Sequence, residues 1–303
     1  MLKLRVLSAA VLLPVVIFAI LKLPTLYVAI ASGLVFALAA WEWLNMIVLK
    51  NISKSFDDRV IIQGIDAVME SGKCNLIIGS SGSGKTVLTK CIVGLIQPDE
   101  GGIIEYNGQD IVQMDDKALK VVRQQIGMLF QGNALFDSMT VQENIKFPLD
   151  MFTKLTHGEK LKKVDEVLER VNLSNAHKRF PAEISGGMKK RVGIARSIVL
   201  NPKYLFCDEP NSGLDPLTSL VIDKLIREIT IEYQMTTVVV THDMNSVMEI
   251  GDHILYLYNG KKQWEGSNKD IIFSKDQLLN DFIFASEFLQ DAKQMRMQEA
   301  GNQ

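Results

Sequence analysis

Hydrophobic and polar positions divide the chain into an apolar leader, residues 1–45, and a longer segment in which short apolar runs alternate with amphipathic stretches. Residues 75–78 and 204–208 are short and mostly apolar, which is typical of strands buried on both faces of a parallel sheet. The stretches 86–96 and 185–200 have the length and apolar spacing of helices. Strands that alternate with helices predict an α/β fold built on a parallel sheet.

Two further patterns concern a helical segment and two hairpins. Residues 140–173 carry apolar side chains at helical spacing: Leu161, Val164, Val167, Leu168 and Val171. We expect most of these side chains to pack in the core rather than to form an interface. Asn-Gly pairs at 107–108 and 259–260 are typical of type I′ turns and predict antiparallel strands beside the parallel core.

The leader is apolar enough to enter a membrane. Its only charged side chains are Lys3, Arg5, Lys22 and Glu42. At about 1.5 Å per residue, a helix over residues 25–44 would span about 30 Å, the thickness of one bilayer core. The apolar run 6–21 is shorter, and Pro24 stands between the two runs, where a tight turn is expected. We therefore expect a transmembrane helical hairpin with a cytoplasmic N-terminus, which Lys3 and Arg5 favour.

Two other interpretations of the leader remain open. A secretory signal peptide has a similar character, although this apolar stretch runs past the usual length of a signal. Met46 is also a possible start of translation, because the second segment begins there without a linker. The leader, from Leu2 to Trp43, resembles the N-terminal membrane segment of bacterial phosphatidate cytidylyltransferases. That activity is not assigned, because nothing later in the chain resembles the active-site region of those enzymes.

Composition and charge exclude several classes of protein. Hydrophobic residues make up 47% of the chain and charged residues 22%, which excludes a disordered protein. The formal net charge of -2 excludes a nucleic-acid-binding protein that depends on bulk positive charge. Cys74, Cys91 and Cys207 are odd in number and widely spaced, so neither a disulfide framework nor a metal-ligand motif is expected. We expect reduced core thiols and an intracellular location for most of the chain.

The clearest chemical motif is a glycine-rich loop between the predicted strand at 75–78 and the predicted helix at 86–96. Its residues match the nucleotide-binding pattern GxxxxGK[ST]: Gly79, Ser80, Ser81, Gly82, Ser83, Gly84, Lys85 and Thr86. Glycines let successive backbone N–H groups wrap around a phosphate chain, and the helix N-terminus adds positive potential. We expect Lys85 to reach the β- and γ-phosphates and the Thr86 hydroxyl to ligate Mg2+. A flexible Gly/Ser turn is the alternative, and the flanking strand and helix argue against it.

Acidic and imidazole groups follow two other predicted strands. Asp208 and Glu209 end the apolar run that starts at Tyr204, and ligands of α/β sheets bind at the carboxyl ends of strands. We expect Asp208 to hold Mg2+ through water and Glu209 to act as the general base on the attacking water. His242 follows the β-branched run 235–240, where it can hydrogen-bond a γ-phosphate. Without Lys85, a solvated turn and a structural histidine would be the simpler interpretations.

The segment that opens the helix at 185–200 adds a third element. Ser185 is a good N-cap, and Gly186 and Gly187 would let a phosphate approach the start of the helix. Taken alone, this pattern is that of an ordinary capped helix. Its position far after Lys85 and just before the acidic strand gives an order of motifs that matches one family.

Residues 46 to about 266 resemble the ATPase domain of an ATP-binding-cassette (ABC) transporter. Six motifs stand in the family's order: the loop 79–86, Gln131 in the Q-loop, the signature Ser185-Gly186-Gly187, Walker B at Asp208-Glu209, the D-loop ending at Asp215, and the switch residue His242. The resemblance implies a P-loop ATPase with a RecA-like parallel core, an antiparallel β subdomain and an α-helical subdomain. It also places Phe56 where the family has an aromatic ring that stacks on adenine.

The same resemblance implies a mechanism. Two ATPase domains would form a head-to-tail homodimer, and each ATP would lie between the loop 79–86 of one copy and Ser185, Gly186 and Gly187 of the other. Glu209, His242 and Gln131 would serve hydrolysis, while Thr86, Gln131 and Asp208 would hold Mg2+. The conformational change that accompanies ATP binding and hydrolysis would be transmitted to a multispan permease through the stretch after Gln131 and the segment 140–173.

Two segments resemble one branch of the family. Residues 130–141 and 185–192 are similar to those of the ATPases of MCE (mammalian-cell-entry) lipid-transport systems, with Met188 and Lys189 where many ABC proteins carry Gln. This implies phospholipid transport between the inner and outer membranes, with the ATPase on the cytoplasmic face of the inner membrane. The implied partners are a permease and an MCE-domain lipid-binding protein, and no nucleic acid. The alternatives are a solute importer, a lipoprotein-type exporter or a non-transport ABC ATPase. Residues 267–303 are a predicted C-terminal helical extension.

Overall fold

The computed structural model describes residues 45–57, 59–285 and 287–301. The chain divides into two units, Met1–Leu44 and Asn45–Gln303, and the described residues all belong to the second. The predicted transmembrane hairpin, and the other interpretations of the leader, lie outside the described residues. Among the described residues, no helix combines the length and the hydrophobicity needed to cross a membrane.

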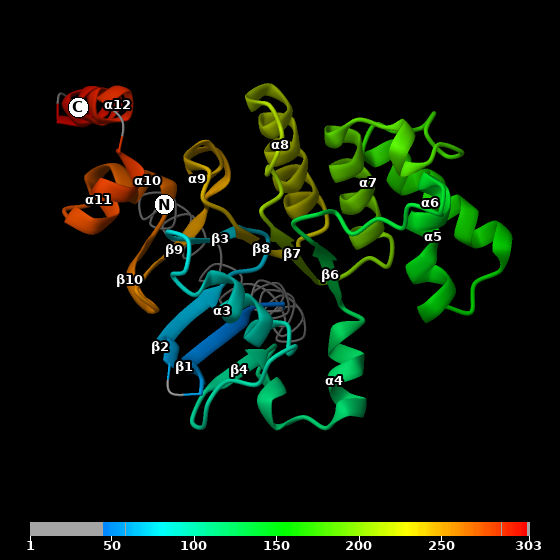
Figure 1. Cartoon of the computed structure of the whole chain (residues 1–303), viewed down its shortest axis with the longest axis horizontal. Helices are drawn as coiled ribbons and strands as arrows, with labels where there is room; N and C mark the ends of the chain where they lie inside the picture. Colours follow the sequence, from blue (N-terminus) through cyan, green and yellow to red (C-terminus); the bar gives the residue numbers. More distant parts are fainter. Residues whose placement is uncertain (1–44, 58, 286, 302–303) are drawn as a thin grey trace, which may run out of the picture. The chain divides into compact units, whose positions relative to one another are not determined.

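Two β-sheets form the framework of the unit that begins at Asn45 (Figure 1). The six-stranded sheet has the order β10-β9-β3-β8-β7-β6 and comprises β3 (Cys74–Ile78), β6 (Ile126–Leu129), β7 (Tyr204–Asp208), β8 (Thr236–Val240), β9 (His253–Tyr258) and β10 (Lys261–Gly266). The strands from β9 to β6 are parallel, and β10 pairs antiparallel with β9. The antiparallel sheet has the order β2-β1-β4-β5 and comprises β1 (Ile47–Phe56), β2 (Arg59–Met69), β4 (Ile103–Tyr106) and β5 (Gln109–Asp110). The predicted α/β fold with a parallel core and a separate antiparallel sheet is confirmed.

Helices connect the strands and cover the six-stranded sheet. They are α3 (Lys85–Ile92), α4 (Asp116–Arg123), α5 (Val141–Phe152), α6 (His157–Arg170), α7 (Gly186–Ile198), α8 (Pro216–Glu232), α9 (Met244–Ile250), α10 (Asn268–Phe273), α11 (Gln277–Ile283) and α12 (Glu287–Gly301), with short 3-10 helices at Ile111–Gln113 and Pro181–Glu183. Figure 1 shows α7, α8 and α9 above the six-stranded sheet and the antiparallel sheet below it.

Two hydrophobic cores lie on opposite faces of the six-stranded sheet. Leu76 and Ile78 of β3 pack in the core formed with α5 to α9, whereas Ile77 packs in the core shared with the antiparallel sheet and α3. All five residues of β3 are buried. A strand that is covered on both faces has no side that faces solvent, which explains why its sequence is mostly apolar.

The predicted helical segment 140–173 consists of two helices, α5 and α6. Each begins with a capping box, Thr140 with Glu143 and Thr156 with Glu159, in which side chain and backbone satisfy each other's hydrogen bonds. Of the apolar positions singled out from the sequence, Leu161 is half-buried and the other four are buried. The prediction that they mainly pack in the core is confirmed.

Helix α3 is shorter than predicted. It ends at Ile92 rather than near residue 96, because Gly94 adopts a φ of +70° and its N–H donates to the carbonyl of Cys91 at 3.0 Å. A left-handed residue just after the last turn stops a helix, and glycine adopts that conformation without a Cβ clash. The Arg123 guanidinium donates to the Gly94 carbonyl and holds the turn.

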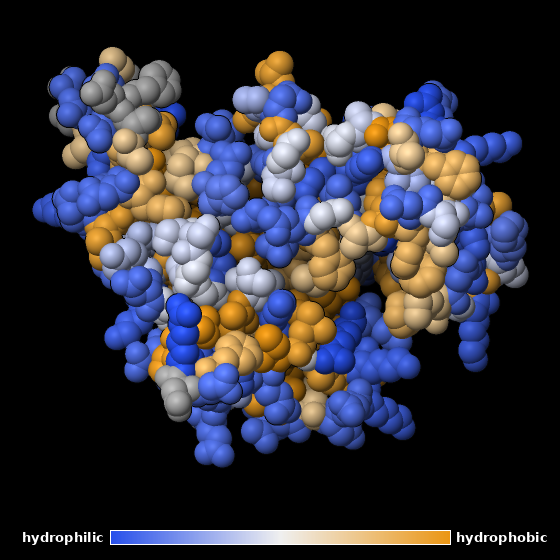
Figure 2. All heavy atoms as spheres, viewed as in Figure 1, coloured by the Kyte–Doolittle hydropathy of each residue, from blue (hydrophilic) through white to orange (hydrophobic). Residues whose placement is uncertain are grey.

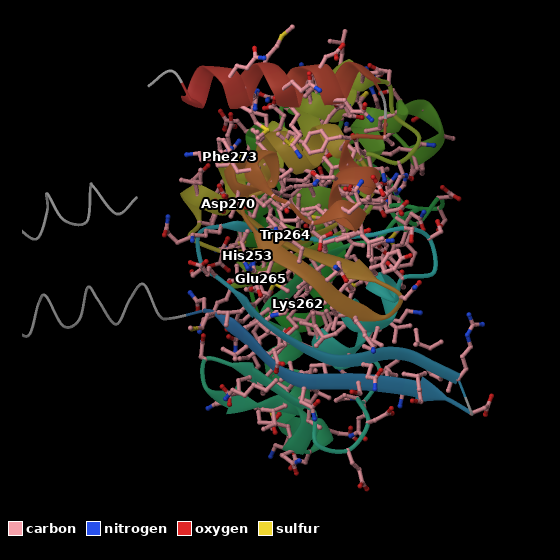
Figure 3. The ribbon with its side chains drawn as sticks, turned by 90° about the vertical axis from the view of Figure 1, so that its left-hand side faces the viewer. His253, Lys262, Trp264, Glu265, Asp270 and Phe273 are labelled. Atoms are coloured by element: carbon pink, nitrogen blue, oxygen red, sulfur yellow. The ribbon has the colours of Figure 1, made fainter. Side chains whose placement is uncertain are left out.

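Both Asn-Gly pairs form the predicted hairpin turns. Asn107 and Gly108 connect β4 to β5, and Asn259 and Gly260 connect β9 to β10, all four with positive φ. The second hairpin carries a cluster of charged groups that Figure 3 shows. Glu265 lies 2.9 Å from His253 Nε2 and accepts from Lys262 Nζ at 2.7 Å.

The C-terminal helices α10 and α11 pack on the same domain. Ile271, Leu279 and Ile283 belong to the core that also contains residues of α5 to α9. The sequence left open whether this segment packs on its own domain or on a second subunit. These contacts show that α10 and α11 are part of the hydrophobic core of the same chain.

Candidate nucleotide-binding site

The loop between β3 and α3 has the shape of a phosphate cradle. A Cβ at Gly79 would lie 2.4 Å from the Leu257 carbonyl oxygen, and a Cβ at Gly84 would lie 2.4 Å from Ile62 Cγ2. Gly84 also has a φ of +99°, so only glycine fits the backbone at either end of this loop. The hydroxyl of Ser83 is buried, without a hydrogen-bond partner among the described residues. A tight loop with an unpaired buried polar atom is suited to a polar ligand.

Lys85 lies inside this loop. Its Nζ donates to the carbonyl oxygens of Gly79 at 2.8 Å and Ser80 at 2.9 Å. Burial lowers the pKa of Lys85, and the nearby carboxylates of Glu209 and Asp208 oppose that shift. The ammonium is thus held at the centre of the loop, while Thr86 is exposed beside it.

Gln131, Glu209 and His242, predicted from separate parts of the sequence, meet in one cluster. Gln131 Nε2 donates to Glu209 Oε2 at 2.8 Å, and His242 Nδ1 lies 3.0 Å from Glu209 Oε1. Both oxygens of the Glu209 carboxylate are therefore oriented by side chains. This is the arrangement expected of a group that must aim at a reacting water.

Asp208 lies at the carboxyl end of β7, next to this cluster. Burial raises the pKa of Asp208, as does the neighbouring charge of Glu209, while Lys85 acts in the opposite direction. Two adjacent carboxylates with a lysine nearby form a charged site at the edge of the sheet, where α/β proteins bind ligands.

The signature segment caps α7 as predicted. The hydroxyl of Ser185 accepts from the Met188 N–H at 3.3 Å, and both Ser185 and Gly186 are exposed. Gly187, in contrast, is buried, and a Cβ there would lie 2.6 Å from Thr218 Cγ2. The sequence suggested that both glycines serve phosphate approach, but Gly187 also allows α7 and α8 to pack closely.

Asp215 and Phe56 occupy other parts of the surface. Asp215 caps α8: it accepts from the Thr218 hydroxyl at 2.5 Å and from the Thr218 N–H at 3.0 Å, and these two hydrogen bonds lower the pKa of Asp215. Phe56, at the end of β1, is 43% exposed, and Lys54 Nζ lies 5.5 Å from the centre of its ring. In the described part of the chain, no hydrogen bond joins Ser185, Asp215 or Phe56 to the loop 79–86.

Lys190 contacts the same cluster, although no motif in the sequence indicates it. This side chain is buried, and its Nζ donates to the backbone carbonyls of Gln131 at 3.0 Å and Glu209 at 3.2 Å. Nothing in the sequence distinguishes it from its neighbour Lys189, because only the tertiary structure shows which of the two faces inward.

The side chains around the loop fit a nucleoside triphosphate with Mg2+. Thr86, Gln131 and Asp208 offer hydroxyl, amide and carboxylate oxygens, and Mg2+ prefers oxygen ligands from one or two carboxylates together with substrate phosphates. Within residues 45–57, 59–285 and 287–301, no group of three or more His, Cys, Asp or Glu side chains is arranged to hold a metal ion. The cysteines Cys74, Cys91 and Cys207 are free and buried, as the sequence predicted.

The fold and the loop together define a P-loop nucleotide-binding protein. A family model described as ABC transporter matches residues 62–212. The chain belongs to this family, as an ATP-binding subunit that hydrolyses ATP.

Several curated proteins are similar to the chain. The probable ribonucleotide transport ATP-binding protein mkl of Mycobacterium leprae is 36% identical over 235 residues, 78% of this chain and 67% of the relative. The intermembrane phospholipid transport system ATP-binding protein MlaF of Haemophilus influenzae is 36% identical over 239 residues, 79% of this chain and 90% of the relative. The methionine import ATP-binding protein MetN of Carboxydothermus hydrogenoformans is 40% identical over 232 residues, 76% of this chain and 68% of the relative. The chain spans about two thirds of the length of the mkl relatives.

Solved structures show the same fold. The dimeric structure of MJ0796, a bacterial ABC transporter cassette, aligns with a TM-score of 0.67 at 31% identity and covers 73% of this chain and 98% of that one. The structure of cbiO1 from Clostridium perfringens, part of the transporter complex cbiONQ, aligns with a TM-score of 0.71 at 28% identity and covers 78% of this chain and 94% of that one.

Proposed function

We propose that this ABC transporter ATPase drives phospholipid transport between the inner and outer membranes through a partner permease. The observation that carries the proposal is the similarity to MlaF, which extends over 90% of that relative. The segments 130–141 and 185–192, which resemble the ATPases of MCE lipid-transport systems, support the same assignment. The proposed site of action is the cytoplasmic face of the inner membrane, with an MCE-domain lipid-binding protein as a further partner.

A solute importer is the second candidate function. The MetN relative is 40% identical, slightly more than MlaF, but the similarity covers only 68% of that protein. Identity at this level does not separate the two substrates, because the ATPase domain contacts the nucleotide and the permease rather than the cargo.

In the proposed reaction, ATP lies in the loop 79–86 and Lys85 moves from the loop carbonyls to the β- and γ-phosphates. Mg2+ held by Thr86, Gln131 and Asp208 would neutralise charge on the phosphates. Glu209 accepts a proton from the attacking water. Its carboxylate is oriented for this step by Gln131 and His242, which hydrogen-bond its two oxygens.

We propose that the site is completed by a second copy of the chain. Ser185 and Gly186 stand exposed at the N-terminus of α7, where backbone N–H groups and the helix dipole favour an anion. In a head-to-tail dimer this end of α7 would face the γ-phosphate held by the partner's loop, next to Asp215 and the D-loop. The dimeric assembly of the MJ0796 cassette supports this arrangement.

A groove between β6, α5 and the end of α7 is the proposed docking surface for the permease. It has a volume of about 400 Å³, and its lining includes Met128, Phe130, Phe136, Phe147, Phe152 and Leu200, with Arg123 and Arg196. Phe130, Phe136 and Phe152 are each more than 40% exposed. Figure 2 shows hydrophobic side chains on both sides of a hollow in this region. The groove is lined by residues on both sides of Gln131 in the sequence and by part of α5. A movement of Gln131 on nucleotide binding would therefore be transmitted to an apolar permease helix that lies in the groove.

A charge in the groove tests this docking surface. We expect Phe152→Asp to abolish ATP-dependent transport and permease binding, because it replaces an apolar contact with a carboxylate that loses hydration when the interface forms. The ATPase rate of the isolated chain should stay within about twofold of wild type, since Phe152 ends α5 and is not one of the residues proposed to bind or hydrolyse ATP. The matched control is Phe273→Asp on α10 (Figure 3), which is 54% exposed and should leave transport unchanged. Equal transport by both variants would show that the permease does not dock in this groove.

The substrate class is tested by the proteins that bind the chain in its own membrane. The full chain, purified with its partners in mild detergent, should carry a multispan permease and an MCE-domain protein, identified by mass spectrometry. The reconstituted complex should show ATPase activity that rises with added phospholipid and not with amino acids. A permease accompanied by an amino-acid-binding protein would instead support the importer.

A further inference from the structure

A buried lysine connects the signature helix to the catalytic cluster of the same chain. Lys190 is 2% exposed, and its ammonium bonds the backbone carbonyls of Gln131 and Glu209. The same helix, α7, begins one turn earlier with Ser185 and Gly186 on the surface. One helix therefore presents its N-terminus to solvent and a cation to the two loops that carry Gln131 and Glu209.

Stability alone does not explain a cation at this position. Burying an ammonium costs free energy unless it is fully paired, and an apolar side chain of similar volume usually serves stability at least as well. A side chain that is costly to bury and bonds two functional loops is a candidate for a functional role.

The backbone of Glu209 has an unfavourable conformation that the hydrogen bond from Lys190 would stabilise. Glu209 has a φ of +45°, a left-handed conformation that is unfavourable for a residue other than glycine. Its N–H donates to Val240 at 2.9 Å, and its carbonyl accepts from both Ser212 N–H at 3.2 Å and Lys190 Nζ. Such a conformation persists only where the surrounding structure fixes it. Of the three groups that hydrogen-bond the Glu209 backbone, Val240 and Ser212 use backbone atoms, and Lys190 uses its side chain.

We propose that Lys190 is a positioning residue that fixes the backbone of Glu209 and Gln131 relative to α7. The proposal rests on the proposed role of Glu209 in hydrolysis. In a head-to-tail dimer, the N-terminus of α7 would contact ATP bound to the partner copy, while Lys190 would set the geometry of hydrolysis in its own copy. The two nucleotide sites would thus be mechanically linked through one helix.

The test compares three substitutions in the full chain. Lys190→Met keeps the length of the side chain and removes its donors, so kcat should fall by about 10- to 100-fold, the cost of misplacing a catalytic group. KM for ATP should stay within about threefold, because the loop 79–86 is untouched. Lys190→Arg should restore most of the kcat, since its guanidinium can donate to both carbonyls. Lys189→Met is the matched control, because Lys189 makes no side-chain hydrogen bond or ion pair among the described residues, and it should retain wild-type kcat.

Several results would overturn the proposal. An unchanged kcat in Lys190→Met, a rise in KM alone, or an equal loss in Lys189→Met would each show that the contact does not position Glu209. If Lys190→Met fails to fold, Lys190→Gln decides, with a reduced kcat at unchanged KM supporting the proposal and a wild-type kcat contradicting it. Glu209→Gln separates this inference from the proposed function. If Glu209→Gln keeps full turnover, the proposed role of Glu209 as general base is contradicted. If Glu209→Gln is inactive and Lys190→Met is fully active, only the positioning role of Lys190 is contradicted.

Discussion

Lys85 is the residue on which we propose that nucleotide binding depends most directly. Its ammonium bonds two carbonyls of the loop 79–86, which places the positive charge where phosphates would enter. We expect Lys85→Ala to lower ATP hydrolysis at least about 100-fold, comparable to the loss of one transition-state donor. Turnover assays with ATP and Mg2+ measure this effect. Retention of more than about a tenth of the wild-type rate would contradict the proposed role.

Asp223 gives the protein a carboxyl group with a pH-dependent effect on stability. It is 1% exposed, accepts from the Ser246 hydroxyl at 2.8 Å, and its Oδ1 has no hydrogen-bond partner among the described residues. Burial raises the pKa of Asp223 from 3.8 to about 6, although hydrogen bonds from Ser246 and Asn211 act in the opposite direction. A carboxyl group whose pKa is raised by folding stabilises the folded state at low pH, and that contribution is lost as pH rises through about 6.

Asp223→Asn should therefore change stability in a pH-dependent way. The free energy of unfolding of the variant, relative to wild type, should increase by up to about 3 kcal/mol between pH 4 and pH 7. Other titrating groups are common to both proteins and cancel in this comparison. Urea denaturation at a series of pH values measures the difference. A constant or decreasing difference would show that Asp223 is not the source.

The sequence indicates candidate site residues but not the contacts between them. Lys85, Asp208, Glu209 and His242 were each recognisable because a short motif sits at the end of a buried strand. The bonds from Gln131 and His242 to Glu209 join residues far apart in the chain, and no local pattern indicates them. Lys190 was missed for the same reason, since its partners are backbone atoms of two other loops.

At the scale of elements, α7 combines structural and functional demands. Gly187 allows close packing on α8, and Gly193 allows it on β6, where a Cβ would lie 2.6 Å from Leu129 Cδ1. Ser185 caps the helix and stands at the proposed interface between two copies. The sequence predicted the cap and the extent of this helix because both depend on local chemistry, whereas helix-to-helix contacts at Gly187 depend on the partner element.

Two N-cap substitutions separate the structural and functional parts of Ser185. Ser185→Ala and Thr156→Ala each remove a capping side chain, from α7 and α6 respectively, and should each lower stability by about 1 kcal/mol. Only Ser185→Ala should also lower ATP turnover, because only α7 is proposed to face a nucleotide. Thermal unfolding and ATPase assays on both variants measure this. Equal turnover in the two would leave Ser185 with a capping role alone.

Helix ends and sheet order show where local patterns stop being informative. The early end of α3 depends on Gly94 and on an arginine from α4, so the apolar run to Ile96 overestimated the helix. The strand order β3-β8-β7-β6 was not predicted, because sequence patterns indicate strands without indicating their neighbours. Both hairpins, in contrast, were predictable from two residues each.

At the scale of the whole molecule, the proposed ATPase cycle requires two copies of the chain that bind ATP between them. The loop 79–86 and the exposed signature at Ser185 are both present in each copy, and no hydrogen bond joins them in the described residues. A second copy supplies the missing side of each site in the proposed dimer. The mass of the nucleotide-bound protein therefore tests the account more directly than any single rate.

The decisive measurement is the mass of full-length Glu209→Gln in detergent, by light scattering, with and without ATP and Mg2+. Glu209→Gln should bind ATP without hydrolysing it, so the protein mass should double with nucleotide. Adding Ser185→Arg to the same variant should prevent the doubling, because a bulky side chain would block the proposed contact. An unchanged mass at an ATP concentration that saturates binding would contradict the proposed sharing of ATP between two copies.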